Sequence, residues 1–481
     1  MAPSLSSEDR TRFYVVAIGL LIGIRFIAAA FLPLFFGDEL YYWMWSKHLA
    51  WGYYDHPPAI AALIRAGTAL FGDTEFGVRF FGLALTVPTT MCVWRTGTLL
   101  LGGSEHGARA ALYFNLMLMV HAVSFLAAPD APMLACSAAF IWSIAEAEAR
   151  ADGRWWLAAG LFAGLGLLSK YIVLFLGLGV FLWLVLTGNG RRWLATPWPW
   201  LGGAIAALVF SPHVIWNASN DWVSLGFQFG RLGFSGRGRW YYLPQFVGEQ
   251  LVIASPFILI LAMIGLWRAA LSGDSNRILI AALCWPIILF CFGYVFVDRI
   301  HRNWIDVIYP ALALAAADAW RRQYGTAFIR RAAVPTAVAL LVIIYGQALF
   351  RPFSLAPYDQ LNHHLASTMR QVAVPIARAV EMTQARGILT TDFPITSWLH
   401  FYLRPQVPII MVADEFRFLT APPATAQHLD GTLIYVALKT DMLPVLTGRF
   451  SRVERLEGLP PTPFLVYRVS GFKGEPYGRI P

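Results

Sequence analysis

Long apolar stretches recur along most of this chain, and they limit the folds open to it more than any other feature. A helix needs about 20 mainly apolar residues to cross the hydrocarbon core of a bilayer. Of the 481 residues, 57% are hydrophobic and 14% are charged, where a soluble protein carries about 25% charged residues. The predicted spans are 13–35, 78–100, 107–126, 131–148, 155–169, 171–187, 199–216, 246–267, 278–297, 304–320 and 333–350.

This pattern predicts a polytopic α-helical membrane protein with about 11 transmembrane helices. An outer-membrane barrel would instead alternate in segments of about 10 residues, and the sequence lacks that alternation. The stretch 155–187 is open to two interpretations, one long helix or two helices that meet at Ser169-Lys170. Two short helices fit better, because 33 residues exceed what a tilted single span needs.

The charges between the spans predict an orientation. If the N-terminus is cytoplasmic, the loops on its side hold most of the arginine, which is the positive-inside pattern. These residues are Arg10, Arg12, Arg150, Arg154, Arg191, Arg192, Arg268, Arg277, Arg321, Arg322, Arg330 and Arg331. Topology therefore explains the net charge of +9 better than nucleic-acid binding does. The opposite loops hold the acids Asp38, Glu39, Asp55, Asp73, Glu75 and Asp130.

An odd number of spans places the C-terminal segment on the outer side. We expect a transmembrane domain over residues 1–351, with long outer loops at 37–77 and 217–245, and an extracytoplasmic domain over 352–481. The stretches "GTLIYVAL" (431–438) and "PFLVYRV" (463–469) predict strands, and the segment before them predicts helix. The C-terminal domain is therefore expected to be a small α/β domain.

The acids of the first outer loop are the first candidates for chemistry. Asp38 and Glu39 follow the first span, and Asp130 stands in "AAPDAPM" between two later spans. Each position has a structural alternative: Asp38 and Asp130 could cap the helices that follow them. The aromatic residues after Asp38 could likewise form an ordinary interfacial belt; they are Tyr41, Tyr42, Trp43 and Trp45.

Basic groups on the same side form the second set. His56 follows Asp55 in "YYDHPP", and a histidine can titrate near neutral pH. Lys170 lies at the junction of two spans, where snorkelling to the interface is the alternative. The remaining members depart from the positive-inside trend and predict an anionic partner; they are Arg231, Arg237, Arg239, His301 and Arg302. Cationic donors stabilise a phosphate leaving group directly, and a carboxylate takes a proton from a nucleophile.

Five motifs together resemble the membrane glycosyltransferases of the GT-C type that use polyprenyl-phosphate sugars. They are "GDELYYWMWSKHLAWGYYDHPP", "AAPDAPMLA", "GLGLLSKY", "FSPHVIWNASNDW" and "HRNWIDVIYPALA", spread over about residues 13–320. The resemblance is to the family-39-like branch, which includes protein O-mannosyltransferases and the lipid A aminoarabinose and galacturonic acid transferases.

The resemblance implies roles for individual residues. Asp38 matches the catalytic acid, Glu39 its neighbour and Asp130 a second acid on another outer loop. His56 stands where the aminoarabinose transferases have a lysine that contacts the donor phosphate, and this departure indicates a different donor or acceptor. Lys170, the arginines of loop 217–245, His301 and Arg302 are further phosphate candidates. A substrate pocket is expected from Tyr41, Tyr42, Tyr54, Asp55 and Trp304.

The implied reaction moves a sugar from a polyprenyl-phosphate donor to a hydroxyl of an envelope acceptor, with inversion, on the periplasmic face of a bacterial inner membrane. The acceptor could be lipid A, another glycan or a protein. No cofactor is required, and a divalent metal is possible but not implied. We expect contact with membrane lipids and none with nucleic acid. Two other classes stay open at this stage: a transporter or flippase of lipid-linked sugars, and a scaffold protein.

Overall fold

The chain forms two compact units, each built from segments that lie far apart in the sequence. The computed structural model describes residues 6–32, 34, 37–231, 242–350, 352–353, 373–438, 443–460, 462 and 464–481. The first unit consists of Met1–Ala30 and Phe80–Pro352, and the second of Phe31–Arg79 and Phe353–Pro481. Residues of the predicted outer loop 37–77 thus group with the C-terminal segment rather than with the helices that flank them.

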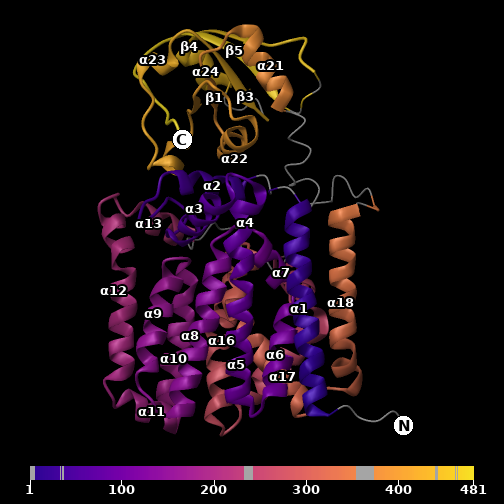
Figure 1. Ribbon diagram of the computed structural model, residues 1–481. Helices are drawn as coiled ribbons and strands as arrows, with labels where there is room; N and C mark the ends of the chain where they lie inside the picture. Colours follow the sequence, from indigo (N-terminus) through magenta and orange to yellow (C-terminus); the bar gives the residue numbers. More distant parts are fainter. Residues whose placement is uncertain are drawn as a thin grey trace. The chain divides into compact units, whose positions relative to one another are not determined.

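The first unit is helical, and its long helices lie side by side (Figure 1). Three short 3-10 turns, η1 (Tyr171–Val173), η2 (Arg302–Trp304) and η3 (Asp306–Ile308), interrupt the helices. The α-helices are α1 (Ser7–Phe31), α5 (Thr86–Leu101), α6 (Ser104–Leu116), α7 (Leu118–Phe125), α8 (Asp130–Arg150), α9 (Trp155–Leu167), α10 (Leu174–Leu186), α11 (Gly188–Leu194), α12 (Trp198–Ala218), α13 (Val223–Gly230), α14 (Tyr242–Ile253), α15 (Pro256–Ala270), α16 (Ser275–Tyr294), α17 (Tyr309–Arg321) and α18 (Ala327–Phe350).

Several helices have the length and composition of membrane spans. Among the described residues, five pass this test: Ser7–Phe31, Glu75–Leu101, Trp198–Ala218, Ser275–Tyr294 and Ala327–Phe350. Three further apolar pairs are bent by 68° (α6 and α7), 106° (η1–α10 and α11) and 106° (α14 and α15). The count therefore reaches eight if each pair is one span, and the predicted number of about 11 is not confirmed.

Two of the predicted spans contain a bend at an identifiable residue. Stretch 107–126 breaks at Met117, whose backbone is extended, and stretch 246–267 breaks before Pro256, where Ser255 has a positive φ of 65°. A proline cannot donate the backbone hydrogen bond that would continue the helix before it. The stretch 155–187 contains two helices, α9 and α10, which confirms the prediction of a break at Ser169-Lys170.

A fully buried arginine holds the broken pair of helices against α1. The guanidinium of Arg25 donates to Asn115 Oδ1 at 2.9 Å and to the Asn115 carbonyl at 3.1 Å, at the end of α6. It also lies 3.2 Å from His121 Nδ1 on α7, and that ring nitrogen is 2.9 Å from the Tyr345 hydroxyl of α18. Ionisable groups inside a bundle face its interior and bind polar partners, so Arg25 ties four helices together.

Small residues let the central helices approach closely. Every residue of α17 from Tyr309 to Ala319 is buried, and a Cβ atom on Gly265 of α15 would lie 2.2 Å from the Ala315 carbonyl oxygen. A Cβ atom on Gly160 of α9 would lie 2.1 Å from the Gly202 carbonyl of α12. Membrane helices pack in this way because small side chains allow dispersion contacts between backbones.

The second unit combines three helices from the first outer loop with a small α/β domain. The loop helices are α2 (Asp38–Lys47), α3 (Ala59–Phe71) and the start of α4 (Glu75–Ala84). The C-terminal elements are α21 (Ala373–Thr383), β1 (Ile388–Thr390), α22 (Phe393–Trp398), the π-helix η4 (Leu399–Leu403), β2 (Ile409–Met411), η5 (Glu415–Phe418), α23 (Ala426–Leu429), β3 (Thr432–Ala437), α24 (Leu443–Arg449), β4 (Phe450–Arg455) and β5 (Leu465–Phe472).

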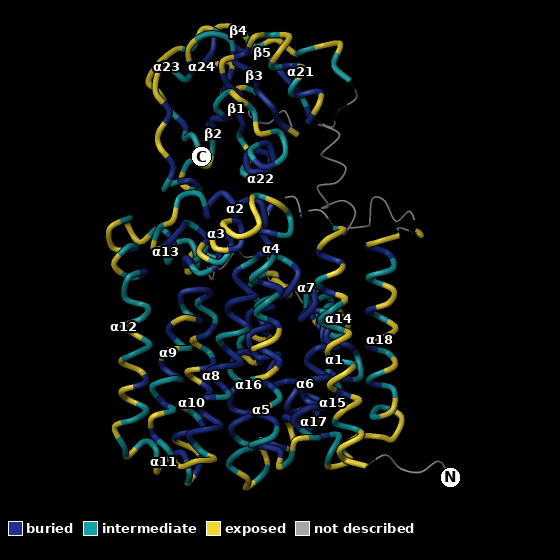
Figure 2. Tube along the Cα trace, in the orientation of Figure 1, coloured by how far each residue is buried: buried dark blue, intermediate teal, exposed yellow. Residues whose placement is uncertain are grey.

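The five strands form one mixed sheet in the order β2-β1-β3-β5-β4. β1 is parallel to β2 and β3, whereas β5 is antiparallel to β3 and β4. Strands β1, β2 and β3 are almost wholly buried (Figure 2), as continuous apolar runs predict for the centre of a sheet. The two strands predicted at 431–438 and 463–469 are confirmed as β3 and β5.

Candidate functional site

The two adjacent acids at the start of α2 have opposite surroundings. Gly37 is the N-cap of α2, with a φ of 110° that favours glycine. Asp38 is the first helical residue and its side chain is exposed, where a carboxylate interacts favourably with the helix dipole. Asp38 is therefore not the N-cap, and that form of the capping alternative is wrong.

Glu39 instead belongs to a buried ion pair. Its two carboxylate oxygens accept hydrogen bonds from Arg79 of α4, at 2.9 Å from Nε and 2.6 Å from Nη2. Both side chains are at most 1% exposed, and Arg79 also donates to the Leu32 carbonyl at 2.6 Å. This bidentate pair fixes α2 to α4 and orients the segment that carries Asp38. The predicted catalytic role of Glu39 remains a prediction.

The aromatic residues of α2 pack inside the second unit, so the interpretation as an interfacial belt is wrong for them. Tyr41, Tyr42, Trp43 and Trp45 are all at most 6% exposed. The ring of Tyr41 lies 4.7 Å from that of Phe393 and 5.5 Å from that of Phe418. These partners come from the C-terminal segment, which the sequence pattern of the loop did not reveal.

A second ion pair joins the loop to the C-terminal segment. Arg417 Nη1 lies 3.0 Å and 2.9 Å from the two oxygens of Asp55, and the Tyr41 hydroxyl donates to the Arg417 carbonyl at 3.1 Å. The guanidinium also lies 4.3 Å from the ring centroid of Phe393. Sequence reasoning missed Arg417, because nothing in "DEFRF" links it to a residue 362 positions earlier.

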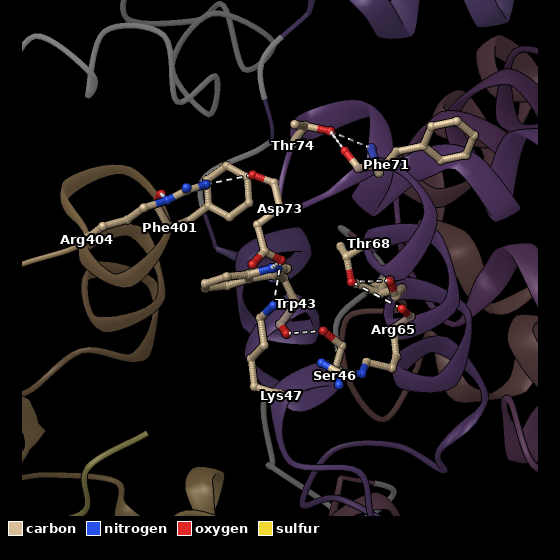
Figure 3. A network of polar contacts seen from close by, with 12 residues as sticks. Trp43, Ser46, Lys47, Arg65, Thr68, Phe71, Asp73, Thr74, Phe401 and Arg404 are labelled. Atoms are coloured by element: carbon tan, nitrogen blue, oxygen red, sulfur yellow. Dashed lines mark hydrogen bonds and ion pairs between the residues drawn. The ribbon is translucent and has the colours of Figure 1, made fainter.

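Asp73 makes a third link between the same segments (Figure 3). Its carboxylate accepts from Trp43 Nε1 at 2.8 Å and from Lys47 Nζ at 2.5 Å. Burial raises the pKa of Asp73, but the hydrogen bonds from Lys47 and Trp43 outweigh it and leave the pKa below its usual value. The backbone carbonyl of Asp73 accepts from Arg404 at 2.7 Å. Lys47 and Arg404 thus both bind Asp73.

The other loop candidates are partly accessible. His56 is half-buried, and its ring centroid lies 6.2 Å from that of Tyr42. Tyr54 is also half-buried and lies 4.4 Å from the ring of Phe416. Asp38 and His56 therefore keep access to their surroundings, whereas Glu39, Tyr41 and Asp55 fill the interior of the unit.

In the first unit, the predicted acid and lysine form a direct pair. Asp130 is the first residue of α8, and Lys170 lies in the break between α9 and η1. Lys170 Nζ is 2.5 Å from Asp130 Oδ1 and 3.3 Å from the Asn303 carbonyl. Asn303 Nδ2 donates to the same Asp130 oxygen at 3.0 Å. The break at Ser169-Lys170 therefore serves to place an ammonium group.

The electrostatics keep this lysine charged. Burial lowers the pKa of Lys170, but the charge and the hydrogen-bonding oxygen of Asp130 counteract it, and the pKa lies above its usual value. Lys170 is 9% exposed and Asp130 is 6% exposed, so the interaction is little screened by water. A snorkelling lysine at the lipid interface does not describe this position, because the side chain is buried and paired.

Asp306 is a member of this cluster that sequence reasoning missed. It lies in η3 and is fully buried. The signal was present in "NWIDVIYP", where a single acid interrupts an apolar run, because Asp is almost never fully buried without a partner. In this motif His301 and Arg302, but not Asp306, are predicted site residues.

Three predicted basic residues lie near the same cluster. Arg231 acts electrostatically on Lys170, and the charges of Arg231, Lys170 and Arg302 all reach His301. Burial, followed by these cations, lowers the pKa of His301, so its imidazole is neutral at pH 7. Trp304 packs beside them, 6.0 Å from the His301 ring and 5.3 Å from the Tyr294 ring.

Two predicted phosphate ligands, Arg237 and Arg239, lie outside the described residues. Within the described ranges, no three side chains of His, Cys, Asp and Glu gather as ligands of a metal would. The expectation of a reaction without a required metal stays a prediction. The described candidates thus fall into two groups, one around Asp38 in the second unit and one around Lys170 in the first.

Comparison with known proteins supports the resemblance found in the sequence. Residues 55–216 match the family described as dolichyl-phosphate-mannose-protein mannosyltransferase. The chain is 26% identical over 296 residues to the lipid A galacturonosyltransferase RgtD of Rhizobium johnstonii, a match that covers 59% of this chain and 60% of that protein.

A second relative is the undecaprenyl phosphate-alpha-4-amino-4-deoxy-L-arabinose arabinosyl transferase 1 of Sodalis glossinidius, 26% identical over 328 residues. That match covers 63% of this chain and 56% of the relative. The chain thus spans about three fifths of the length of each curated relative that it matches.

Solved structures share the fold over nearly the whole chain. ArnT from Cupriavidus metallidurans in the apo state has a TM-score of 0.65 at 18% identity, and the match covers 95% of this chain and 98% of that one. The same protein bound to undecaprenyl phosphate has a TM-score of 0.66 at 17% identity, with the same coverage. The chain therefore has an ArnT-like helical fold with a small C-terminal sheet.

Proposed function

We propose that this protein is an integral-membrane glycosyltransferase that moves a sugar from a polyprenyl-phosphate carrier to a hydroxyl group of lipid A. The observation that carries the proposal is the cluster in the first unit, where Lys170, Arg231 and Arg302 lie near one another in a fold shared with ArnT. One ArnT structure is bound to undecaprenyl phosphate, and both curated relatives are named as sugar transferases.

The cationic cluster suits a donor that carries one phosphate. Cations that hydrogen-bond to phosphate oxygens stabilise the charge that develops as the sugar–phosphate bond breaks. Lys170 is suited to this role because its charge is maintained and Asp130 fixes its position. In this proposal Arg231 and Arg302 bind the same phosphate group, and Asp130 orients Lys170.

Asp38 is the group that we assign to the acceptor. Its carboxylate is exposed at the start of α2, and Glu39 and Arg79 fix the helix that carries it. The acceptor hydroxyl transfers its proton to Asp38 and attacks the anomeric carbon. The bond from that carbon to the phosphate oxygen breaks, the polyprenyl phosphate leaves, and the anomeric configuration inverts. We place this reaction on the periplasmic face of the inner membrane.

The sugar is expected to differ from the aminoarabinose of the second relative. His56 and its neighbours Asp55, Pro57 and Pro58 replace the Glu-Lys-Pro-Pro that the aminoarabinose transferases have at this position, and a histidine contacts phosphate as a cation only when protonated. The relative that acts on lipid A with galacturonic acid makes a hexuronic acid the first sugar to test.

The experiment for the overall function is mass spectrometry of lipid A from cells with and without the gene. We expect a species heavier by one sugar residue only when the protein is present, and the mass difference identifies the sugar class. Purified protein in detergent should also consume a lipid-linked sugar, a result that a flippase would not give. Unchanged lipid A together with no consumption of donor would contradict the proposal.

The donor site is tested with Lys170→Met. Loss of one hydrogen bond to a charged group costs about 1.5–3 kcal/mol, so we expect kcat/KM for the donor to fall by at least about tenfold. The matched control is Lys473→Met, which removes an exposed lysine just after the end of β5 and should leave the kinetics unchanged.

Asp38→Asn should abolish transfer, and full activity in that variant would disprove the role of Asp38 as base.

A further inference from the structure

Asp306 is a buried acidic residue that the proposed reaction does not use. Its side chain is fully buried, and among the described residues no donor lies in hydrogen-bonding geometry to either carboxyl oxygen. A buried carboxylate without donors is strongly disfavoured. The carboxyl group of Asp306 must therefore either be neutral or have its charge compensated.

The donors around Asp306 are already directed elsewhere. Lys170 donates to Asp130 and to the Asn303 carbonyl, and the Asn303 amide donates to Asp130. On α17, the Tyr309 hydroxyl lies 3.4 Å from Gln250 Oε1 of α14. The backbone amide of Val307 is the remaining donor that acts on Asp306, and it does not reach hydrogen-bonding geometry.

The buried charges around Asp306 do not balance if Asp130, Lys170 and Asp306 are all ionised. The group contains two carboxyls, Asp130 and Asp306, and one ammonium, Lys170, which act on one another. Full ionisation would leave one net negative charge on these three buried groups; Arg231, which also acts on Lys170, is only half-buried. Two carboxyl groups that share a site avoid this cost when one of them keeps a proton.

The same proton supplies the missing hydrogen bond. The carboxyl group of Asp130 acts on Asp306, and two carboxylates repel each other unless one of them donates a hydrogen bond. Asp130 already accepts from Lys170 and Asn303, which stabilises its ionised form. The proton therefore belongs on Asp306, whose O–H then donates to Asp130.

We propose that Asp306 is held as the neutral carboxylic acid and acts as a positioning residue, donating a hydrogen bond to Asp130 so that the Asp130–Lys170 pair stays fixed beside the donor phosphate. The consequence for catalysis rests on the proposed function, whereas the protonation does not. With Asp306 neutral, Asp130 and Lys170 cancel, and Arg231 and Arg302 keep the site positive. Loss of the proton at alkaline pH adds a negative charge next to an anionic substrate.

The kinetic test compares two substitutions over a range of pH. Asp306→Asn keeps the shape and the donor of the neutral acid, so we expect kcat/KM at pH 7 to stay within about threefold of the unmodified protein. We also expect this variant to lose the alkaline decline of kcat/KM. Asp306→Ala removes the donor and should reduce kcat/KM more than tenfold. An Asn variant as inactive as the Ala variant would show that the carboxylate form is needed and would overturn the proposal.

A spectroscopic test needs no substrate. A protonated carboxylic acid has an infrared carbonyl band separate from that of carboxylates, and this band should disappear in Asp306→Asn. The matched control is Asp221→Asn, which changes an exposed aspartate with a positive φ, a conformation that asparagine also adopts readily, and should keep the band. A spectrum of Asp306→Asn identical to that of the unmodified protein would disprove the protonation. If the band disappears but no transferase activity is found, only the proposed function fails.

Discussion

The adjacent acids Asp38 and Glu39 differ in exposure and in binding partners. Asp38 is exposed at the start of α2, whereas Glu39 is buried in a bidentate pair with Arg79. Two adjacent helical positions point about 100° apart around the axis, because a helix has about 3.6 residues per turn. A pair of acids in a sequence therefore does not by itself indicate a pair of catalytic groups.

Glu39→Gln is expected to damage stability rather than chemistry. It leaves Arg79 buried without its carboxylate, and removal of one partner from a buried pair costs about 3–5 kcal/mol. The measurement is thermal unfolding in detergent, with Asp38→Asn as the matched control, which we expect to unfold at the temperature of the unmodified protein. Equal stability of the two variants would contradict the structural role of Glu39.

Arg417→Ala tests the link between the loop and the C-terminal segment. Asp55 would remain buried without its partner, and we expect a loss of about 3 kcal/mol, at the low end for broken pairs because Arg417 is partly exposed. Combining it with Asp55→Asn should restore part of the loss, since the uncompensated charge is then gone. A double variant as unstable as the sum of the two single variants would rule out the coupling.

His301 should make donor binding depend on pH. Its pKa lies below the usual value because of burial and the neighbouring cations, so the imidazole is neutral at pH 7 and becomes a cation only at acidic pH. We expect KM for the phosphate donor to decrease over that acidic range. The depressed pKa also means that the contribution of His301 to folding stability is lost as the pH falls. His301→Gln should keep KM constant there; a decrease that persists would point to another group.

At the scale of the elements, the close packing of two helices depends on the size of the side chains between them. Gly202 and Gly203 are adjacent on α12, yet a Cβ atom on Gly202 would lie 2.5 Å from the Trp156 carbonyl of α9, whereas Gly203 has no atom within 4 Å. Apolar stretches predict both helices, but not which of their glycines faces the other helix.

Gly202→Ala is therefore expected to separate α9 from α12. Overpacking of this kind costs about 1–3 kcal/mol, visible as a lower unfolding temperature in detergent. Gly203→Ala is the control and should change stability by less than about 0.5 kcal/mol. If both variants unfold at the same temperature, the close approach of the two helices at Gly202 is not present in solution.

At the scale of the whole molecule, each compact unit is built from segments that are not consecutive in the sequence. Phe31–Arg79 separates α1 from the rest of the helical unit and groups with Phe353–Pro481. The ion pairs and rings that join these segments are between residues more than 300 positions apart. The predicted outer loop 37–77 is thus part of a second folded unit.

The predicted orientation is tested with fusions to the C-terminus. Positively charged loops on the N-terminal side predict that the C-terminal domain is periplasmic. Alkaline phosphatase fused after Pro481 should be active, because it folds only in an oxidising compartment, and green fluorescent protein fused there should be dark. The reverse result would place the C-terminus in the cytoplasm and contradict the predicted topology.

The sequence by itself determined the helical class of this protein, whereas the roles of its candidate site residues stay predictions. Hydrophobicity follows directly from composition, so membrane helices, the break at Ser169-Lys170 and the strands β3 and β5 were predictable. The resemblance carried by five motifs was confirmed by the relatives. Asp130 and Lys170 were selected separately, and the structure joins them at 2.5 Å.

Only the tertiary structure decided how those residues are used. The bend at Met117 lies where Arg25 of α1 binds Asn115 at the end of α6, a contact that local hydropathy does not reveal. The pairing of Glu39 with Arg79 and the burial of the α2 rings and of Asp306 result from contacts between segments apart in the sequence. The free energy of a charge depends on what surrounds it, and its surroundings are set by the fold.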